Sequence, residues 1–378
     1  DAIKEFERAL QIDPEDHSGA RVGLGTAWML LGERAKAIAA WKEATGAPWN
    51  AASAWKRLGV ALRQDGQTDE GIAALRKAVA ADPNSLSCIV ALAIAVEDAG
   101  RIDETVALLR RAYQKWPDSP VLPELLGIAL LERDSPQQAV PYLRRGAELA
   151  PNLCDAQLSL GVALGKCGEM AASLEHLRKG LRLAGADPRK KGQAEKLIRH
   201  AEEFQRLQPR LNKVLLDPDA DPADAAEAVA LAKACQEFNR RYFAAAGLFA
   251  CAFKKKPALA DDLAAAHRYN AACVAAMAGC GRGIDAGTLN GEDRAGLRRR
   301  ALAWLRDDLA AWMKRLEGGG PADRKEVREK MKHWQKDYDL IGVRDAEALK
   351  RLPAGEREDW KKLWADVRAL QKRAEGKE

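Results

Sequence analysis

Apolar residues recur every three or four positions along most of the chain, and short turns containing Gly, Asp or Pro separate the segments that they form. This spacing is typical of amphipathic helices that bury one face. Ala, Leu, Arg, Glu and Lys dominate the composition and aromatic residues make up only 6%, a mixture that favours helices over strands. We therefore expect an all-α protein.

The helical pattern repeats with a fixed step of 34 residues. Gly59 is small enough to let the first helix of its unit approach the second closely, while Leu62 and Leu75 fill the space between the two helices. Asp82-Pro83 would end the second helix. Each helix pair has an apolar face that it cannot bury alone, so successive pairs should stack. The residues in step are Gly25, Gly59, Ala93, Gly127 and Gly161; Trp41, Leu75, Leu109, Leu143 and Leu177; and Pro83, Pro117 and Pro151.

This pattern resembles the tetratricopeptide repeat (TPR). The places of that repeat are filled here by Trp55, Leu58, Gly59, Leu62, Gly71, Leu75, Ala78 and Pro83. The resemblance implies a right-handed α-solenoid of helix hairpins over residues 1–188, made of half a repeat and five complete repeats. The half repeat is the second helix of an earlier unit, since Ala2, Phe6, Ala9 and Pro14 fit that helix. We expect a further N-terminal part before Asp1.

Three segments follow the repeats. Residues 189–222 should form a linking helix and an acidic connector, in which Asp221 is the expected N-cap of the next helix. Residues 223–290 contain degenerate repeat hairpins, because Ala245, Phe249, Ala252 and Pro257 keep the spacing of a second helix. Residues 291–378 should form a C-terminal helical cap of three main helices with a short turn-and-helix between the last two. The first runs from about 292 to "GGGP", the second carries Val327, Met331 and Trp334, and the third carries Trp360, Leu363, Trp364, Val367 and Leu370.

A second resemblance covers residues 189–378. Phrases such as "HRYNAACVAAMAG" and "HWQKDYDLIGVRDAEALKRLP" are similar to the C-terminal region of large bacterial proteins, most typical of planctomycetes, in which a serine/threonine protein kinase domain precedes a TPR array. No Val-Ala-Ile-Lys, His-Arg-Asp or Asp-Phe-Gly motif is present in this chain. The resemblance implies a kinase domain before Asp1, whereas the chain itself is not expected to be an enzyme.

The stretch "HRYNAACVAAMAGCGRG", His267 to Gly283, is the first candidate for chemistry. On a helix, Cys273 and Cys280 would be separated by about 10 Å of rise, which is too far for one disulfide or one metal ion. His267 would lie roughly 120° around the helix from Cys273. We interpret the stretch as a packing helix anchored by Tyr269. No catalytic residue, metal or cofactor is expected.

Cysteine usage and charge bear on the compartment and on the partners. The seven cysteines are scattered and form no Cys-x-x-Cys pair, which favours free thiols in a reducing compartment, the cytoplasm.

Net charge is −3 over residues 1–188 and +9 over residues 189–378. The basic runs 189–191, 254–256 and 298–300 are short and have acidic neighbours, so we interpret them as solvated helix faces or ends. A nucleic-acid-associated scaffold is kept as an alternative, and no apolar run is long enough to cross a membrane.

The TPR resemblance also implies a binding surface. In that family the first helix of each hairpin lines a concave groove. Chaperone-binding members hold a peptide carboxylate there with Lys and Asn, but Thr26 and Val60 occupy the Asn places. The apolar stripe instead predicts binding of an extended or helical apolar protein segment. The alternative occupant is the chain's own C-terminal helices with their Trp-rich faces. The groove positions are Val22, Thr26, Met29, Lys56, Val60, Arg63, Val90, Ile94, Glu97, Glu124, Ile128, Leu131, Leu158 and Val162.

From these observations we predict a non-catalytic protein–protein interaction scaffold. The alternative function is a substrate-recruiting or regulatory region of a serine/threonine protein kinase.

Overall fold

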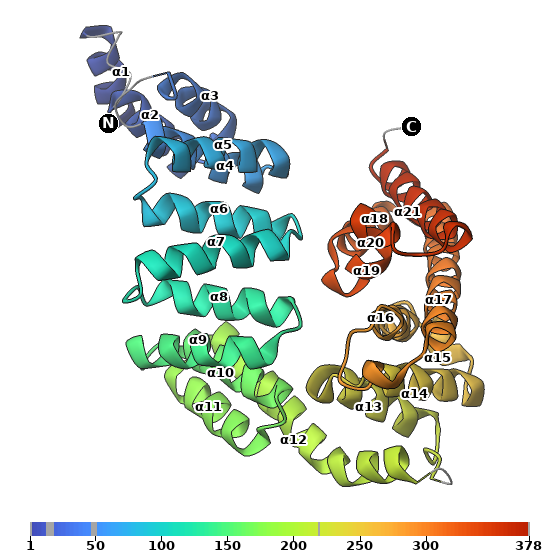
Figure 1. The fold of residues 1–378 in the computed structure, drawn as a ribbon. Helices are drawn as coiled ribbons and strands as arrows, with labels where there is room; N and C mark the ends of the chain where they lie inside the picture. The colour runs from blue at the N-terminus through green and yellow to red at the C-terminus, as the bar shows by residue number, and fades with distance from the viewer. Residues whose placement is uncertain (1, 13–18, 47–50, 218–219, 377–378) are drawn as a thin grey trace. The chain divides into compact units, whose positions relative to one another are not determined.

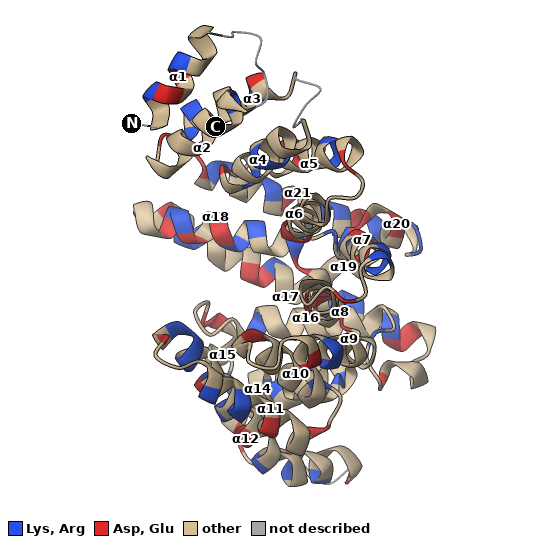
Figure 2. Cartoon of the chain, turned by 90° about the vertical axis from the view of Figure 1, so that its left-hand side faces the viewer, with Lys and Arg blue, Asp and Glu red and all other residues tan. Residues whose placement is uncertain are grey.

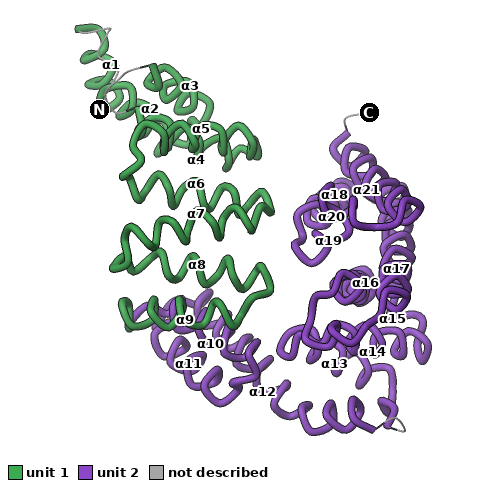
Figure 3. Tube along the Cα trace, in the orientation of Figure 1, with its two compact units in different colours: residues 1–151 green, residues 152–378 purple. Residues whose placement is uncertain are grey.

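A computed structural model describes residues 2–12, 19–46, 51–217 and 220–376, and every regular element within these ranges is helical (Figure 1). The predicted all-α fold is confirmed, while the position of Pro14 lies outside the described residues. No helix in these ranges is both long and apolar enough to cross a membrane. The chain divides into two compact units, residues 1–151 and 152–378 (Figure 3).

In the part of the first unit that the structure describes, one leading helix precedes four helix hairpins. Within each hairpin we call the first helix A and the second helix B. The leading helix is α1 (Ala2–Ile12), and the hairpins are α2 (Ala20–Leu30) with α3 (Arg34–Ala44), α4 (Ala51–Gln64) with α5 (Thr68–Ala81), α6 (Leu86–Asp98) with α7 (Ile102–Lys115), and α8 (Val121–Glu132) with α9 (Pro136–Leu149).

Close contact between the two helices of a hairpin depends on the small residues of the 34-residue step. A Cβ atom added to Gly59 would lie 2.6 Å from Leu75 Cγ and 2.8 Å from the carbonyl oxygen of Gly71. Both distances are shorter than van der Waals contact, so only glycine permits this packing. Gly25 meets the indole of Trp41 in the same way, and Gly127 meets Leu143. The structure thus confirms the close approach inferred from the sequence.

The turn between helix A and helix B also follows the 34-residue step. Gly32, Gly66 and Gly100 have φ values of +81°, +83° and +75°, a left-handed conformation that is unfavourable for residues with a side chain. The fourth turn has Asp134 at this position, with a φ of 59°. Asp tolerates the left-handed region better than most residues. Each turn therefore depends on a residue chosen for its backbone conformation.

The second unit begins with the fifth hairpin and continues through longer helices. Its elements are α10 (Cys154–Lys166), α11 (Met170–Leu183), α12 (Pro188–Leu216), α13 (Ala225–Ala234), the π-helical turn η1 (Cys235–Asn239), α14 (Tyr242–Lys255), α15 (Ala258–Asp261), α16 (His267–Gly279), η2 (Ala286–Thr288), α17 (Gly291–Gly318), α18 (Pro321–Lys336), η3 (Tyr338–Leu340), α19 (Ile341–Arg344), α20 (Ala346–Leu349) and α21 (Ala354–Ala374).

Helix α12 covers most of residues 189–222, and α13 and α14 follow it in the segment expected to contain degenerate repeat hairpins. Helix α12 is a single helix although Pro209 lies inside it. The expected N-cap Asp221 is wrong, because α13 begins at Ala225 and its N-cap is Asp224. The Asp224 carboxylate accepts a hydrogen bond of 2.8 Å from the backbone N–H of Glu227. The carbonyl of Asp221 instead accepts a hydrogen bond from Arg210.

The three predicted C-terminal helices are α17, α18 and α21, and η3, α19 and α20 form the predicted turn-and-helix. Their tryptophans do not form an open face. Trp312, Trp334, Trp360 and Trp364 are buried in a core built from residues of the second unit, and the Trp364 indole N–H donates to the carbonyl of Val343. Because these side chains are buried within the second unit, they are not exposed to fill a groove of the repeats, which argues against that alternative.

Candidate functional site

Twelve of the predicted groove residues lie in the first unit, three on each of four consecutive helices A. We call this surface the helix A face. All twelve side chains are partly exposed, so they are neither core residues nor fully solvated. Helix α2 contributes Val22, Thr26 and Met29; α4 contributes Lys56, Val60 and Arg63; α6 contributes Val90, Ile94 and Glu97; and α8 contributes Glu124, Ile128 and Leu131.

Several polar groups of the helix A face are satisfied within the unit. Lys56 Nζ donates to Ser87 Oγ at 3.0 Å, which links α4 to α6. The Arg63 guanidinium pairs with the Asp98 carboxylate and links the same two helices further along. A partner that binds Lys56 or Arg63 would have to replace these internal contacts. The apolar side chains of Val60, Ile94 and Ile128 have no such contacts to lose, and they can bury surface against a ligand.

Two hollows lie beside this face. The first, of about 480 Å³, is formed by α1, α2 and the start of α4, and is lined by Phe6, Val22, Thr26 and Leu30. The Leu30 side chain is 84% exposed. The second hollow, of about 410 Å³, lies where Lys56 faces Ser85 and Ser87, and it is more polar. Two sections of the face therefore offer recesses of different chemistry.

An acidic group in the middle of the face was only partly foreseen. Burial, together with the nearby carboxylates of Glu132 and Asp98, raises the pKa of Glu97 to about 7. Burial and Asp98 likewise raise the pKa of Glu132. Glu132 was not singled out from the sequence, although it lies one 34-residue step after Asp98. Ionisation of Glu97 is unfavourable in this environment, so a cation placed beside it would be stabilised.

The two groove residues on α10 behave differently. Leu158 is only 2% exposed and lies over Gly180 of α11, so the expectation that it faces a partner is wrong. Gly180 has no side chain and leaves room for Leu158 between the helices. Val162 is partly buried and lines a small cavity of about 150 Å³ together with Leu197 and Phe238. In the fifth hairpin these positions pack within the second unit.

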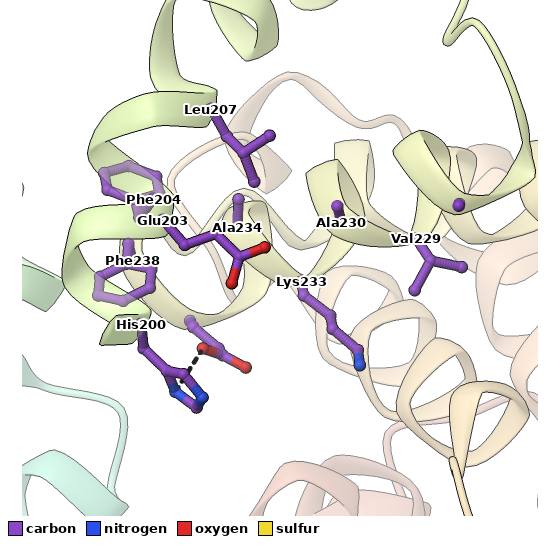
Figure 4. A pocket seen from close by; sticks show the side chains of 11 residues that line it. His200, Glu203, Phe204, Leu207, Val229, Ala230, Lys233, Ala234 and Phe238 are labelled. Atoms are coloured by element: carbon purple, nitrogen blue, oxygen red, sulfur yellow. Dashed lines mark ion pairs between the residues drawn. The ribbon is translucent and has the colours of Figure 1, made fainter. Parts of the chain in front are cut away.

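A further recess, which the sequence did not indicate, lies between α12 and α13 (Figure 4). We call it the α12–α13 slot. Its volume is about 280 Å³. At one end Phe238 of η1 stacks on Phe204 with ring centroids 4.6 Å apart. The polar rim consists of His200, Glu203, Lys233 and Glu237, and the apolar surface consists of Phe204, Leu207, Ala226, Val229, Ala230, Ala234 and Phe238.

The stretch that contains Cys273 is a packing helix, as predicted. Every residue of α16 from Ala271 to Gly279 is buried. Burial raises the pKa of the Cys273 thiol well above its usual range, which opposes formation of the thiolate needed for attack on a substrate. Tyr269 also anchors the helix as expected, since its hydroxyl donates to Asp337 Oδ2 at 2.6 Å and its ring stacks on Trp334.

Cys273, Asp337 and Asp339 bring their sulfur and oxygen atoms within 4.8 Å of one another, which is close enough to consider a metal. Protein donors already occupy the Asp337 carboxylate. Tyr269 donates to Oδ2, the backbone N–H of Asp339 donates to Oδ1, and His333 Nε2 lies 3.3 Å from Oδ2. The Arg282 guanidinium lies 3.8 Å from Asp339 Oδ1 and would repel a cation. We therefore interpret the cluster as a link between α16, α18 and η3.

The basic runs are not all solvated faces. Figure 2 shows basic and acidic residues interspersed along helices such as α18. Lys254–Lys256 are exposed, and Lys190 pairs with Asp155 at 2.8 Å. Arg298 contradicts the expectation, because it is buried and donates to both Glu356 and the carbonyl of Gly279. At least this run therefore serves the internal packing of the second unit.

Helix hairpins in a 34-residue register, with a partly exposed face of helices A, define a helical-repeat protein. A sequence model of the tetratricopeptide repeat matches residues 52–95. This segment spans nearly all of α4, then α5 and most of α6. The resemblance seen in the sequence is thus supported for the part of the chain where the register is most complete.

Several solved structures resemble the chain over about half of its length. One is YrrB, described as a TPR protein with an unusual peptide-binding site: identity is 18%, the match covers 51% of this chain and 99% of YrrB, and the TM-score is 0.42. Another is MamA from Desulfovibrio magneticus RS-1, with 14% identity, 50% and 98% coverage and a TM-score of 0.40. No curated protein matches the chain. At this similarity the neighbours carry no argument about a ligand.

Proposed function

We propose that this protein is an interaction scaffold that binds an apolar segment of a partner protein on the helix A face. The observation that carries the proposal is the row of partly exposed apolar side chains at one place on successive helices, Val60, Ile94 and Ile128. Apolar side chains in such a row favour association because contact with a partner removes them from water. Helices of a repeat array are a rigid support for such a surface.

The Glu97 carboxylate adds a preference within this proposal. It lies one turn from Ile94 on α6, and neither the Glu97 nor the Glu132 carboxylate forms a hydrogen bond or an ion pair within the described parts of the chain. A basic residue in the partner segment would relieve the unfavourable ionisation of Glu97. The partner is therefore an apolar segment that carries Lys or Arg among its contact residues.

The test is affinity capture of partner proteins by the purified chain, compared between the wild type and a double variant, Ile94→Asp with Ile128→Asp. Two new charges on the helix A face should abolish specific capture, while circular dichroism shows the same helix content. The matched control is Ala73→Asp with Ala107→Asp, which places the same charges 34 residues apart on exposed positions of helices B. Equal capture by the wild type and the groove variant would contradict the proposal.

A more specific version of this proposal is that the scaffold serves as a substrate-recruiting or regulatory region of a serine/threonine protein kinase. It is favoured by the resemblance of residues 189–378 to regions that follow a serine/threonine kinase domain. In that case the helix A face would recruit kinase substrates. The coding sequence upstream of Asp1 tests this directly, since a Gly-rich loop and His-Arg-Asp would support it and further repeats would count against it. A cytoplasmic location remains a prediction from the cysteines.

A further inference from the structure

The α12–α13 slot is held open by contacts at both of its ends. Beyond Leu207, Arg210 forms a bidentate pair with Glu227 of α13, with Nε–Oε1 and Nη2–Oε2 distances of 2.8 and 3.1 Å. At the other end, Phe204 stacks on Phe238. Helix α12 is therefore linked to α13 and η1 at both ends of the recess.

Small side chains on α13 leave the space between these two points unfilled. Ala226, Ala230 and Ala234 recur at intervals of four residues and line the slot, whereas α12 contributes the larger Phe204 and Leu207. Protein interiors normally fill such spaces to the density of organic crystals. A recess with apolar walls and a charged rim, between helices that are linked at both ends, is suited to accept an apolar side chain from outside.

The rim of the slot carries one unused charge on each wall (Figure 4). Glu203 belongs to α12 and Lys233 belongs to α13. Neither side chain forms an ion pair or a hydrogen bond with any part of the chain that the structure describes. His200 and Glu237, in contrast, lie 3.9 Å apart and can pair with each other. The unpaired charges are of opposite sign and lie on opposite walls.

We propose that the α12–α13 slot binds an amphipathic helix of a partner protein, which inserts a large apolar side chain between Phe204 and Ala230. This helix carries a basic residue on the side that faces Glu203 and an acidic residue on the side that faces Lys233. The site is independent of the helix A face, so the chain presents a second docking surface of different chemistry.

The probe is a library of helical peptides displayed on phage, selected on the wild-type chain and counter-selected on Ala230→Trp, whose indole fills the slot. Selected peptides should share a large apolar residue with a basic residue one turn away on one side and an acidic residue on the other. Ala230→Trp should weaken binding of the selected peptide at least about tenfold, because burial of one large apolar side chain is lost. The absence of peptides that distinguish the two proteins would overturn the proposal.

Charge reversal tests the orientation of the bound helix. Glu203→Lys should weaken the selected peptide by about two- to fivefold, the effect of one exposed ion pair, and a peptide with its basic residue changed to Glu should recover that loss. Glu202→Lys is the matched control, since Glu202 is the adjacent residue and pairs with Arg178 instead. Equal losses for Glu202→Lys and Glu203→Lys would rule out the proposed charge contact. The groove variant Ile94→Asp with Ile128→Asp should bind the peptide like the wild type, and a loss there would show that the peptide uses the helix A face.

Thermal stability tests whether the slot is unfilled in the free protein. Ala230→Leu should leave the melting temperature unchanged or raise it, because the added atoms enter an existing recess. Ala232→Leu, on the same helix but fully buried, should lower the melting temperature through overpacking. If Ala230→Leu destabilises the protein as much as Ala232→Leu does, the slot is not available to a side chain and the proposal fails.

Discussion

The Arg298 guanidinium donates to the Glu356 carboxylate with an Nε–Oε1 distance of 2.5 Å and an Nη2–Oε2 distance of 3.0 Å, so that α17 is tied to the start of α21. Both side chains are nearly buried, at 10% and 12% exposure. Arg298 Nη1 also donates to the carbonyl of Gly279 at the end of α16. A single arginine thus joins three helices of the second unit.

Replacement of this arginine should destabilise the second unit. Arg298→Ala would leave the Glu356 charge partly buried without its partner, and we expect a loss of about 3 kcal/mol in the free energy of unfolding. Arg299→Ala is the control, because Arg299 is the next residue and is exposed; its effect should stay within about 0.5 kcal/mol. Denaturant unfolding of both variants measures the difference. Similar effects of the two substitutions would mean that the buried pair does not contribute.

Glu97 predicts a pH dependence of stability in the first unit. Its pKa is raised from 4.5 to about 7 in the folded protein, by burial and then by Glu132 and Asp98, and Asp98 is itself paired with Arg63. The folded state therefore holds a proton that the unfolded state releases, and stability falls as pH rises from about 4.5 through 7. Glu97→Gln removes this loss, so the variant should be more stable than the wild type at pH 8 and nearly equal to it at pH 5.

The measurement for Glu97 is chemical denaturation of both proteins across this pH range. Glu70→Gln serves as the control, since Glu70 is exposed on helix B of the preceding hairpin. A constant difference between Glu97→Gln and the wild type at pH 5 and pH 8 would contradict the assignment. The same titration bears on the proposed function, because a partner with a basic residue should bind more tightly once Glu97 is ionised.

Local signals explain which features could be predicted from the sequence. The hairpins follow from glycines and large apolar residues at fixed spacing, and Gly59 with Leu75 shows that the spacing corresponds to direct contact. The same holds for α12, whose amphipathic pattern continues through Pro209. Hairpin packing and the C-terminal helices were therefore predictable, whereas the N-cap at Asp224 was missed because Asp221 lies directly before Pro222, a residue common at the first position of a helix.

Features that depend on contacts between residues far apart in the sequence were not predictable in this way. The sequence suggests that Arg298 is exposed in the run Arg298–Arg300, because its partner lies 58 residues further along the chain. The α12–α13 slot depends on a π-helical turn that is followed by Arg240 in a left-handed conformation, and no local sequence motif indicates this turn. The residues of the helix A face were predicted from the resemblance to the tetratricopeptide repeat. The burial of Leu158 was not predicted, because it depends on the contact of this side chain with Gly180.

The cysteines of the second unit should react according to burial. Burial raises the pKa of Cys235 to about 12 and that of Cys273 well above its usual range, so iodoacetamide at pH 8 should leave both unmodified in the folded protein. Cys251 is partly exposed and should be alkylated first. Mass spectrometry of the native and the urea-unfolded protein separates the three sites. Rapid labelling of Cys273 in the folded protein would contradict the interpretation of α16 as a packing helix and would support a reactive thiol there.

Two glycines of opposite backbone conformation should respond in opposite directions to the same substitution. Gly66 has a φ of +83° and no atom within 4 Å of an added Cβ, so Gly66→Ala tests the backbone alone, and we expect a loss of about 1 kcal/mol. Gly192 lies inside α12, also with no atom within 4 Å of an added Cβ, and Gly192→Ala should stabilise the protein by about 0.5–1 kcal/mol. Equilibrium unfolding gives both values. Since neither new methyl group contacts a neighbour, only the left-handed turn at Gly66 can account for a difference in sign, and a stabilising Gly66→Ala would contradict the role of this residue in the 34-residue register.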